Sequence, residues 1–353
     1  MRFLIVGLTV SSSWGNGHAT IWRGLCKALS QQGHSVTFFE KDVPYYRNHR
    51  DLTRPDRYDL ELYRDWDEVT ERARVAAAES DCAIVTSYCP DARPASDLIL
   101  DSGTFAVFYD LDTPVTLDAL SRAGEVSYIP EYGLEPFDLV LSYTGGKALE
   151  ELSRQLGARR VAPLYGSVDP SSHRRVPLDD RFSSDFSYLG TYAADRQSQL
   201  EELFLRPATR LPEKKFCIAG AMYPADFPWT SNTYFVRHLS PPEHPAFYSS
   251  SKMTLNVTRG TMAQMGYCPS GRLFEAAACG TPIVSDWWTG LEEFFQPGQE
   301  ILIARTSEDV MDAMELSEDE LKQLSLASQE RALNEHTAAH RAAELITLIE
   351  ANA

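Results

Sequence analysis

Short apolar runs that alternate with helix-like segments constrain this chain more than any other feature of its sequence. Phe3–Gly7 is a continuous apolar run, as expected for a strand buried on both faces of a parallel sheet. A segment with apolar residues at helical spacing follows it and ends at Gly33. Further strands are predicted at Ser35–Glu40, Cys82–Thr86, Phe105–Tyr109, Phe137–Ser142 and Arg160–Leu164. This alternation predicts a doubly wound α/β fold.

A second series of the same kind follows a polar linker, residues 166–184. Its predicted strands are Phe186–Leu189, Lys215–Ala219, Tyr234–Leu239, Lys252–Val257, Pro282–Ser285 and Glu300–Ala304. A chain of 353 residues is also too long for one ordinary core. We therefore expect two Rossmann-like domains, residues 1–165 and 166–336, with a C-terminal helix at 337–353 that completes the first. The charged stretch 47–67 is expected to be a surface excursion that leads into a helix near Trp66–Ala78.

The net charge of −17, from 33 basic and 50 acidic residues, limits the partners. Binding to nucleic acid or to an anionic membrane without specificity needs a basic surface, so neither is expected. No apolar run approaches the ~20 residues of a membrane span, and the N-terminus lacks a signal-peptide pattern. The cysteines lie beside apolar residues and form no Cys-x-x-Cys pair, which favours free thiols in a reducing compartment. A cytoplasmic protein is therefore predicted.

The stretch Cys268–Trp288 combines a short apolar helix with a strand. Ser270 is a natural N-cap, and Gly280 a natural C-cap. Arg272 and Glu275 stand out as polar residues on this helix, and their spacing of three puts them on one face. Bare helix-start amides and an arginine can bind a diphosphate, and a carboxylate one turn on can bind ribose hydroxyls. The alternative, from this stretch alone, is an ion pair between Arg272 and Glu275 on a packing helix.

A small-residue loop follows the first predicted strand. It contains Gly15, Asn16 and Gly17, and His18 comes directly after them. Ligands of doubly wound folds bind at the carboxyl ends of the strands, and a glycine-bearing loop there lets a ligand approach the backbone. The loop is not Gly-x-Gly-x-x-Gly, so a nicotinamide dinucleotide is a weak hypothesis. His18 is a candidate ligand contact, with helix capping as the alternative.

Two carboxylates, Asp110 and Asp112, follow the strand Phe105–Tyr109. At the carboxyl end of a strand they could hold a divalent cation together with a substrate diphosphate. The alternative is a simple loop in which Asp112 turns the chain ahead of Pro114.

Three arginines lie just after predicted strands of the second half: Arg196, Arg259 and Arg272. Each alone is more readily explained as a solvated side chain. Three at equivalent strand ends, in a chain of net charge −17, are better explained by an anion between them. Two α/β halves would put their strand ends face to face across a cleft, where small-molecule sites concentrate.

Several of these residues fall in motifs of one known family. The sequence resembles the retaining GT-B glycosyltransferases of group 1, which have a glycogen-synthase-like fold. Within them it is most similar to the branch named for the spore maturation protein CgeB. The matching segments are Cys268–Asp286, Asn256–Arg259, Leu189–Tyr192 with Asp195–Arg196, Gly166–Pro170 and Glu292–Leu302. The resemblance covers the second half densely and the first half loosely.

The resemblance implies a hexosyltransferase-like enzyme that takes a sugar from a nucleotide sugar, such as a UDP-sugar. It implies retention of configuration. We expect no metal and no other cofactor. The residues expected to bind the donor are Tyr192, Arg196, Arg259, Ser270, Gly271, Arg272, Leu273 and Glu275. Among them, Glu275 matches the glutamate that holds the ribose, and Ser270–Leu273 match the turn that meets the diphosphate. His18 and Asp112 are candidates for polarising the acceptor or touching the donor sugar.

One position departs from the family pattern. Where the wider family has a glutamate that contacts the donor sugar, this sequence has Tyr267, so the identity of the sugar does not carry over. A nucleotide-sugar epimerase and a non-catalytic sugar-binding or coat-associated protein of the same fold remain alternatives. A metal-dependent transferase built on Asp110 and Asp112 would lose activity with a chelator. The sequence leaves the acceptor and the oligomeric state open.

Overall fold

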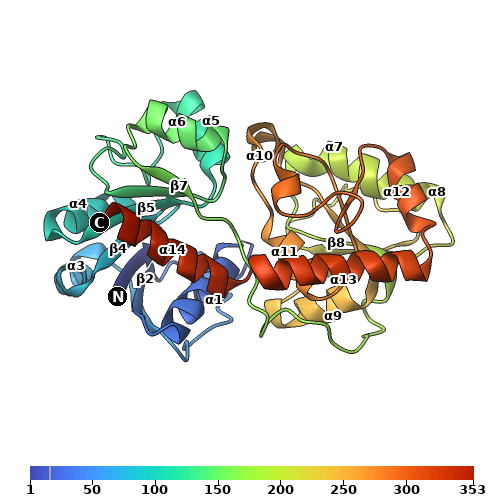
Figure 1. Cartoon of the computed structure of the whole chain (residues 1–353), viewed down its shortest axis with the longest axis horizontal. Coiled ribbons are helices and arrows are strands. Elements are labelled where there is room, and N and C mark those ends of the chain that lie inside the picture. Colours follow the sequence, from blue (N-terminus) through green and yellow to red (C-terminus); the bar gives the residue numbers. More distant parts are fainter. Residues whose placement is uncertain (16) are drawn as a thin grey trace. The chain divides into compact units, whose positions relative to one another are not determined.

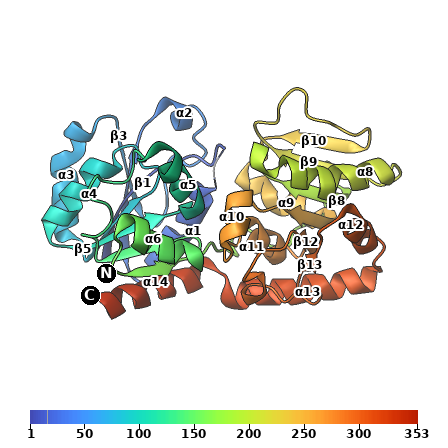
Figure 2. The same cartoon turned by 90° about the horizontal axis from the view of Figure 1, so that it is seen from above.

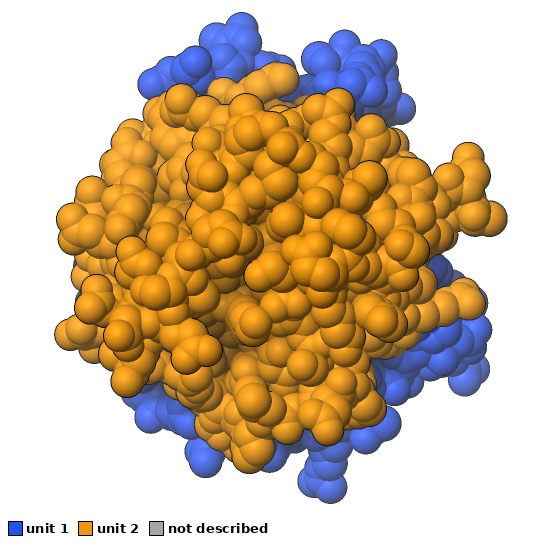
Figure 3. Space-filling view, turned by 90° about the vertical axis from the view of Figure 1, so that its right-hand side faces the viewer, with its two compact units in different colours: residues 1–165, 338–353 blue, residues 166–337 orange. Residues whose placement is uncertain are grey.

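A computed structural model describes residues 1–15 and 17–353. The chain divides into two compact units: unit 1 comprises Met1–Tyr165 and Ala338–Ala353, and unit 2 comprises Gly166–Thr337. Figure 1 and Figure 2 label their elements, and Figure 3 colours unit 1 blue and unit 2 orange. Among the described residues, none of the helices combines the length and the apolar character that a bilayer span requires.

Unit 1 is built on a parallel sheet of seven strands in the order β3-β2-β1-β4-β5-β6-β7. Its strands are β1 (Arg2–Gly7), β2 (Ser35–Lys41), β3 (Asp59–Tyr63), β4 (Cys82–Thr86), β5 (Phe105–Asp110), β6 (Leu139–Ser142) and β7 (Val161–Pro163). Its helices are α1 (His18–Gln31), α2 (Pro44–Arg47), α3 (Trp66–Glu79), α4 (Ala92–Ser102), α5 (Thr113–Ala123), α6 (Lys147–Leu156) and α14 (Ala338–Asn352). The strand order reverses between β1 and β4, so the loops that follow these strands flank the crevice where such sheets bind ligands.

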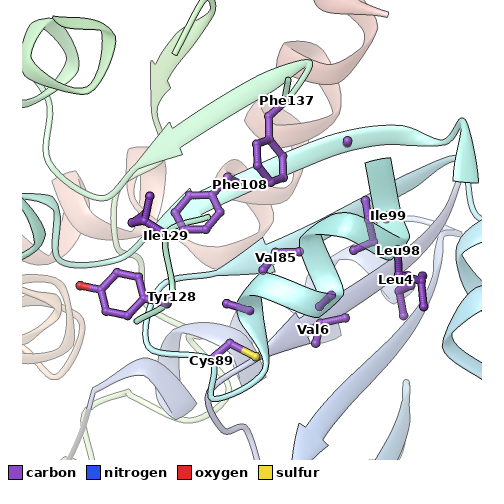
Figure 4. Close-up of a cluster of buried hydrophobic side chains, with 14 of the residues drawn as sticks. Leu4, Val6, Val85, Cys89, Leu98, Ile99, Phe108, Tyr128, Ile129 and Phe137 are labelled. Atoms are coloured by element: carbon purple, nitrogen blue, oxygen red, sulfur yellow. The ribbon is translucent and has the colours of Figure 1, made fainter. Parts of the chain in front are cut away.

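The sheet of unit 1 has an apolar core on each face. On one face, Leu4, Val6, Val85 and Phe108 of the strands pack against side chains of α3 and α4. Figure 4 shows this cluster, in which the rings of Phe108 and Phe137 pack edge to face with their centroids 5.6 Å apart. Strands covered on both faces must be apolar along their whole length, which explains the continuous apolar runs in the sequence.

The C-terminal helix α14 contributes to the core on the other face. Its residues Ala338, Ala342, Leu345 and Ile349 are buried in one cluster with side chains of α1, among them Trp22. These four residues recur at helical spacing. The last helix of the chain is therefore an integral part of unit 1, although unit 2 separates it from the rest of that unit in sequence.

Unit 2 contains a six-stranded parallel sheet in the order β10-β9-β8-β11-β12-β13. Its strands are β8 (Ser184–Leu189), β9 (Phe216–Gly220), β10 (Thr233–Arg237), β11 (Ser251–Asn256), β12 (Ile283–Ser285) and β13 (Leu302–Ile303). Its helices are α7 (Gln197–Leu200), α8 (Arg206–Arg210), α9 (His244–Ser249), α10 (Gly260–Met265), α11 (Gly271–Ala278), α12 (Ser307–Met314) and α13 (Glu318–Glu335). Single helical turns occur at Ala194–Arg196, Glu201–Leu205, Pro241–Glu243 and Leu291–Glu293. Here the strand order reverses between β8 and β11, so the loops after these two strands flank the corresponding crevice of unit 2.

The strand β3 corrects the prediction for residues 47–67. That stretch is not only a surface excursion, because Asp59–Tyr63 pairs in parallel with β2. The segment Asp-Leu-Glu-Leu-Tyr alternates polar and apolar residues, and it lies at the edge of the sheet, where an incompletely buried strand is stable. Its high charge concealed that alternation in the sequence.

We expect the substitution Leu345→Ala to destabilise unit 1 by about 2–5 kcal/mol, because it leaves a cavity between α14 and the sheet core. Hydrogen exchange followed by mass spectrometry measures the effect locally: amides of α1 and the unit 1 sheet should exchange faster, and those of unit 2 should not. The matched control is Thr347→Ala on the exposed side of α14, which should change the free energy of unfolding by less than about 0.5 kcal/mol. Equal protection in the Leu345→Ala and Thr347→Ala proteins would contradict this description of the core.

Candidate functional site

In unit 2, polar side chains gather at the edge where the strand order reverses. The loop after β8 leads to Arg196, the loop after β11 ends at Arg259, and α11 carries Arg272. Parallel strands present their carboxyl ends at the same edge, so these loops are neighbours through the pairing of β8 with β11.

Arg196 and Arg272 both contact Tyr188, the penultimate residue of β8. Arg196 donates from Nη1 to the Tyr188 hydroxyl at 3.3 Å and from Nη2 to the carbonyl of Thr191 at 2.9 Å. The guanidinium of Arg272 lies over the Tyr188 ring, 5.3 Å from its centroid. The Nε of Arg196 is buried without a hydrogen-bond partner among the described residues. Two of the three predicted arginines are thus brought together around one buried tyrosine, which the sequence analysis did not single out.

A hydrogen-bond network fixes Arg272 at the end of β11. Its Nη1 donates to Asn256 Oδ1 at 2.7 Å, and Asn256 Nδ2 donates to Ser285 Oγ at 3.0 Å. The neighbouring Asp286 is buried and accepts from the amide and the hydroxyl of Thr258, both at 3.0 Å. Burial raises the pKa of Asp286. The loop after β11 is therefore held in one shape before any ligand arrives.

The third predicted arginine, Arg259, already has an anionic partner. Its Nε donates to Asp195 Oδ2 at 3.0 Å, and both side chains are about one third exposed. Because Asp195 precedes Arg196, this exposed pair links the loop after β8 to the loop after β11. Arg259 therefore contributes less net positive charge than the sequence analysis assigned to it.

The start of helix α11 offers backbone amides. Ser270 occupies the N-cap position as predicted, but its side chain makes no capping hydrogen bond. The amide of Leu273 donates to the carbonyl of Ser270 at 3.0 Å, and the Leu273 side chain is fully buried. The amides of Gly271 and Arg272 belong to the first turn of the helix, where an amide has no partner within the helix. These two amides, rather than that of Leu273, are the ones placed to meet an anion.

Glu275 does not pair with Arg272, although the two share a face of α11. Within the described chain its ionic partners are two histidines: Glu275 Oε2 lies 3.9 Å from His173 Nε2 and 3.8 Å from His244 Nδ1. Burial alone would raise the pKa of Glu275, but His173, His244 and Arg272 outweigh it and lower that pKa to about 2. The alternative of an ion pair on a packing helix is therefore wrong, and the carboxylate is ionised at neutral pH.

Tyr192, which was predicted to bind the donor, and Tyr267, which departs from the family pattern, have structural roles that the sequence did not indicate. Tyr192 packs in an aromatic cluster, with its ring centroid 5.6 Å from that of Tyr223. Tyr267 has a positive φ of 48°, and its amide donates to the carbonyl of Thr289 at 2.7 Å. A Cβ on Gly290 would lie 2.5 Å from the Tyr267 ring, so Gly290 is required for this ring to lie against the backbone.

In unit 1 the structure brings together the two residues that were predicted separately as catalytic. His18 is the first residue of α1, and Asp112 occupies the N-cap position of α5 without capping it through its side chain. His18 Nε2 and Asp112 Oδ2 are 3.1 Å apart, with 12% and 23% of their side chains exposed. His18 therefore does not cap its helix. The partial exposure leaves this histidine–carboxylate pair accessible to a substrate.

Asp110 differs from Asp112 in being completely buried. Its Oδ1 accepts from the Asp112 amide at 3.1 Å and from the Thr116 hydroxyl at 3.0 Å, while Oδ2 has no hydrogen-bond partner among the described residues. Burial raises the pKa of Asp110 to about 6. Asp110 and Asp112 thus differ: Asp110 is a fully buried carboxyl whose pKa is raised to about 6, and Asp112 belongs to the partly exposed pair with His18.

The predicted glycine loop precedes α1. Gly15 has a φ of +68°, and a Cβ there would lie 2.8 Å from the hydroxyl of Tyr45, so this position requires glycine. Gly17 is the N-cap residue of α1, and a Cβ there would meet nothing within 4 Å. Asn16, the third residue predicted for this loop, lies outside the described residues.

Comparison with known structures decides the fold. A sucrose-phosphate synthase from Thermosynechococcus elongatus superposes with a TM-score of 0.69 at 13% identity, over 99% of this chain and 98% of that one. The Anabaena protein Alr3699/HepE, solved with UDP and glucose, superposes with a TM-score of 0.67 at 10% identity, over 99% of this chain and 100% of that one.

This chain has the GT-B fold. A UDP-N-acetylglucosamine 2-epimerase from Listeria monocytogenes, named as putative, is less similar, with a TM-score of 0.55 at 14% identity over 99% and 95% of the two chains. A family of domains described as glycosyl transferase-like matches residues 196–347. No curated protein matches the sequence.

The raised pKa of Asp110 gives a prediction for stability against pH. A carboxyl whose pKa is 3.8 when unfolded and about 6 when folded favours the folded state below pH 4, and this contribution is lost as the pH rises through 6. We therefore expect Asp110→Asn to gain stability relative to the parent between pH 4 and pH 7, by roughly 2–3 kcal/mol at about 1.4 kcal/mol per pKa unit. Urea unfolding at each pH measures this difference, with the partly exposed Asp118→Asn as control. A stability difference that does not change with pH would contradict the assignment.

Proposed function

We propose that this protein transfers a sugar from a nucleoside-diphosphate sugar to an acceptor hydroxyl. The observation that carries the proposal is the convergence of Arg196 and Arg272 on Tyr188, near the start of α11 and one helical turn from the ionised Glu275. Guanidinium groups and helix-start amides suit a diphosphate, and a carboxylate suits the two hydroxyls of a ribose.

The chemistry follows from the charge that develops during transfer. As the bond between the sugar and the diphosphate breaks, negative charge accumulates on the leaving phosphate. Arg196 and Arg272, held in place by Tyr188 and Asn256, would stabilise that charge without having to reorganise. The resemblance of these motifs to the group 1 family, and to its CgeB-like branch, supports retention of configuration.

Unit 1 supplies the pair proposed to act on the acceptor. A hydroxyl that approaches Asp112 can donate a hydrogen bond to the carboxylate, while His18 holds the carboxylate in orientation. We propose that transfer needs no metal at Asp110 and Asp112. In support, Asp112 is engaged by His18, and Asp110 is fully buried, where the raised pKa of about 6 reflects the cost of placing a negative charge.

UDP is the nucleotide we propose first, because the similar Anabaena protein was solved with it. All six cysteines are buried, which fits the proposal that the protein acts in the reducing cytoplasm. An epimerase of the same fold is the second candidate, favoured by the Listeria structure. Turnover of a UDP-sugar into its epimer without an acceptor, followed by NMR, separates the two functions.

We expect UDP to bind the full chain and Arg196→Ala to weaken the binding about 10- to 100-fold, the range for losing hydrogen bonds between charged groups. Isothermal titration calorimetry in the presence of a chelator measures it. Arg210→Ala, an exposed arginine paired with Glu308 on the surface of unit 2, is the matched control and should bind UDP unchanged. If the parent chain does not bind UDP, or the Arg196→Ala protein binds it equally well, the donor site is wrong.

We expect Asp112→Asn to lower kcat about 10²- to 10⁴-fold, the usual contribution of a general acid or base, while the affinity for UDP stays unchanged. UDP release from UDP-glucose, with water as the acceptor, provides the assay. Asp118→Asn, at a partly exposed position of α5, serves as control. An unchanged kcat, or an equal loss of UDP affinity, would remove Asp112 from the proposed chemistry.

A further inference from the structure

In unit 2, two histidines that the sequence analysis did not single out lie beside Glu275. His173 lies in the linker that begins unit 2, His244 is the first residue of α9, and Glu275 lies on α11. His173 is 2% exposed, and His244 and Glu275 are 14% and 13% exposed. Three segments that are distant in sequence therefore contribute one side chain each to a nearly buried cluster.

The three facing atoms form an almost regular triangle. His173 Nε2 lies 3.5 Å from His244 Nδ1 and 3.9 Å from Glu275 Oε2, and the third side is 3.8 Å. A point equidistant from atoms so spaced lies about 2.2 Å from each, close to the 2.0–2.2 Å bonds of zinc to imidazole nitrogen and carboxylate oxygen. Tetrahedral ligands at such distances are about 3.3–3.6 Å apart, so a small contraction of the triangle completes the geometry.

We propose that His173, His244 and Glu275 bind a divalent transition-metal cation, and that their ligand chemistry selects zinc. Two imidazoles and one carboxylate are a set that zinc accepts, with its fourth position open to water. The metal would tie the linker to α9 and α11. It takes Glu275 Oε2, the oxygen that faces both histidines, so Oε1 stays available for the ribose role proposed above.

A further observation supports the site. Tyr248 lies one turn after His244 on α9, with the two ring centroids 6.5 Å apart. The Tyr248 hydroxyl is buried without a hydrogen-bond partner among the described residues, and water on the metal's fourth position could provide one. All six cysteines are buried, so exposed thiols do not compete for the metal.

The test uses zinc alone, with the full chain freed of metal by a chelator and then dialysed, and without nucleotide. Calorimetry should show that the parent binds one equivalent of zinc. His244→Ala should lower the zinc affinity by more than 10- to 100-fold, which is the loss expected when a residue only orients a metal ligand. His340→Ala, an exposed histidine of α14, should bind zinc like the parent. Cobalt(II) should give the absorption bands of tetrahedral coordination in the parent and not in His244→Ala.

Thermal unfolding separates the metal site from a misfolded variant. Zinc should raise the midpoint of the parent and of His340→Ala, and leave His244→Ala unchanged, while all three melt cooperatively without metal. Absence of zinc binding by the parent, or equal binding by His244→Ala, would overturn the proposal. The zinc experiments contain no nucleotide, and the UDP titration contains a chelator. A negative zinc result therefore does not contradict the proposed transferase, and a negative UDP result does not contradict the zinc site.

Discussion

The parallel pairing of the strands is the constraint on which the rest of this structure depends. All the strand pairs described in both sheets are parallel. Parallel strands need helices on both faces, so the strands are apolar and polar chemistry is left to the loops at their carboxyl ends. In unit 2 those loops bring Arg196 and Arg272 to Tyr188, and in unit 1 they bring His18 to Asp112.

The charged side chains at the carboxyl ends of the two sheets each have specific partners, and these partners differ between unit 1 and unit 2. Arg272 is fixed by Asn256, so a phosphate would meet a guanidinium that is already oriented. Glu275 beside two imidazoles has a pKa lowered to about 2, whereas burial raises the pKa of Asp110 to about 6. The pKa values of these two carboxyl groups thus shift in opposite directions, because burial and neighbouring charges have different weights at the two sites.

The sequence predicted the α/β class and most strands, because strands buried on both faces leave continuous apolar runs such as Cys82–Thr86. It missed β3, where charged residues alternate with apolar ones at a sheet edge. It placed Arg196, Arg272 and Glu275 at strand ends and on one helix, but not their partners. His173 and His244 are 71 positions apart, and no spacing rule indicates that the fold brings them to Glu275. Contacts between distant segments depend on packing, which a periodic pattern does not encode.

A crystal structure of the full chain with UDP tests the central claim most directly. The account predicts the diphosphate between the guanidinium groups of Arg196 and Arg272, with its oxygens on the amides of Gly271 and Arg272. It also predicts the ribose hydroxyls on the Glu275 carboxylate. Density for UDP at any other place on the chain, or a ribose that does not touch Glu275, would contradict the account.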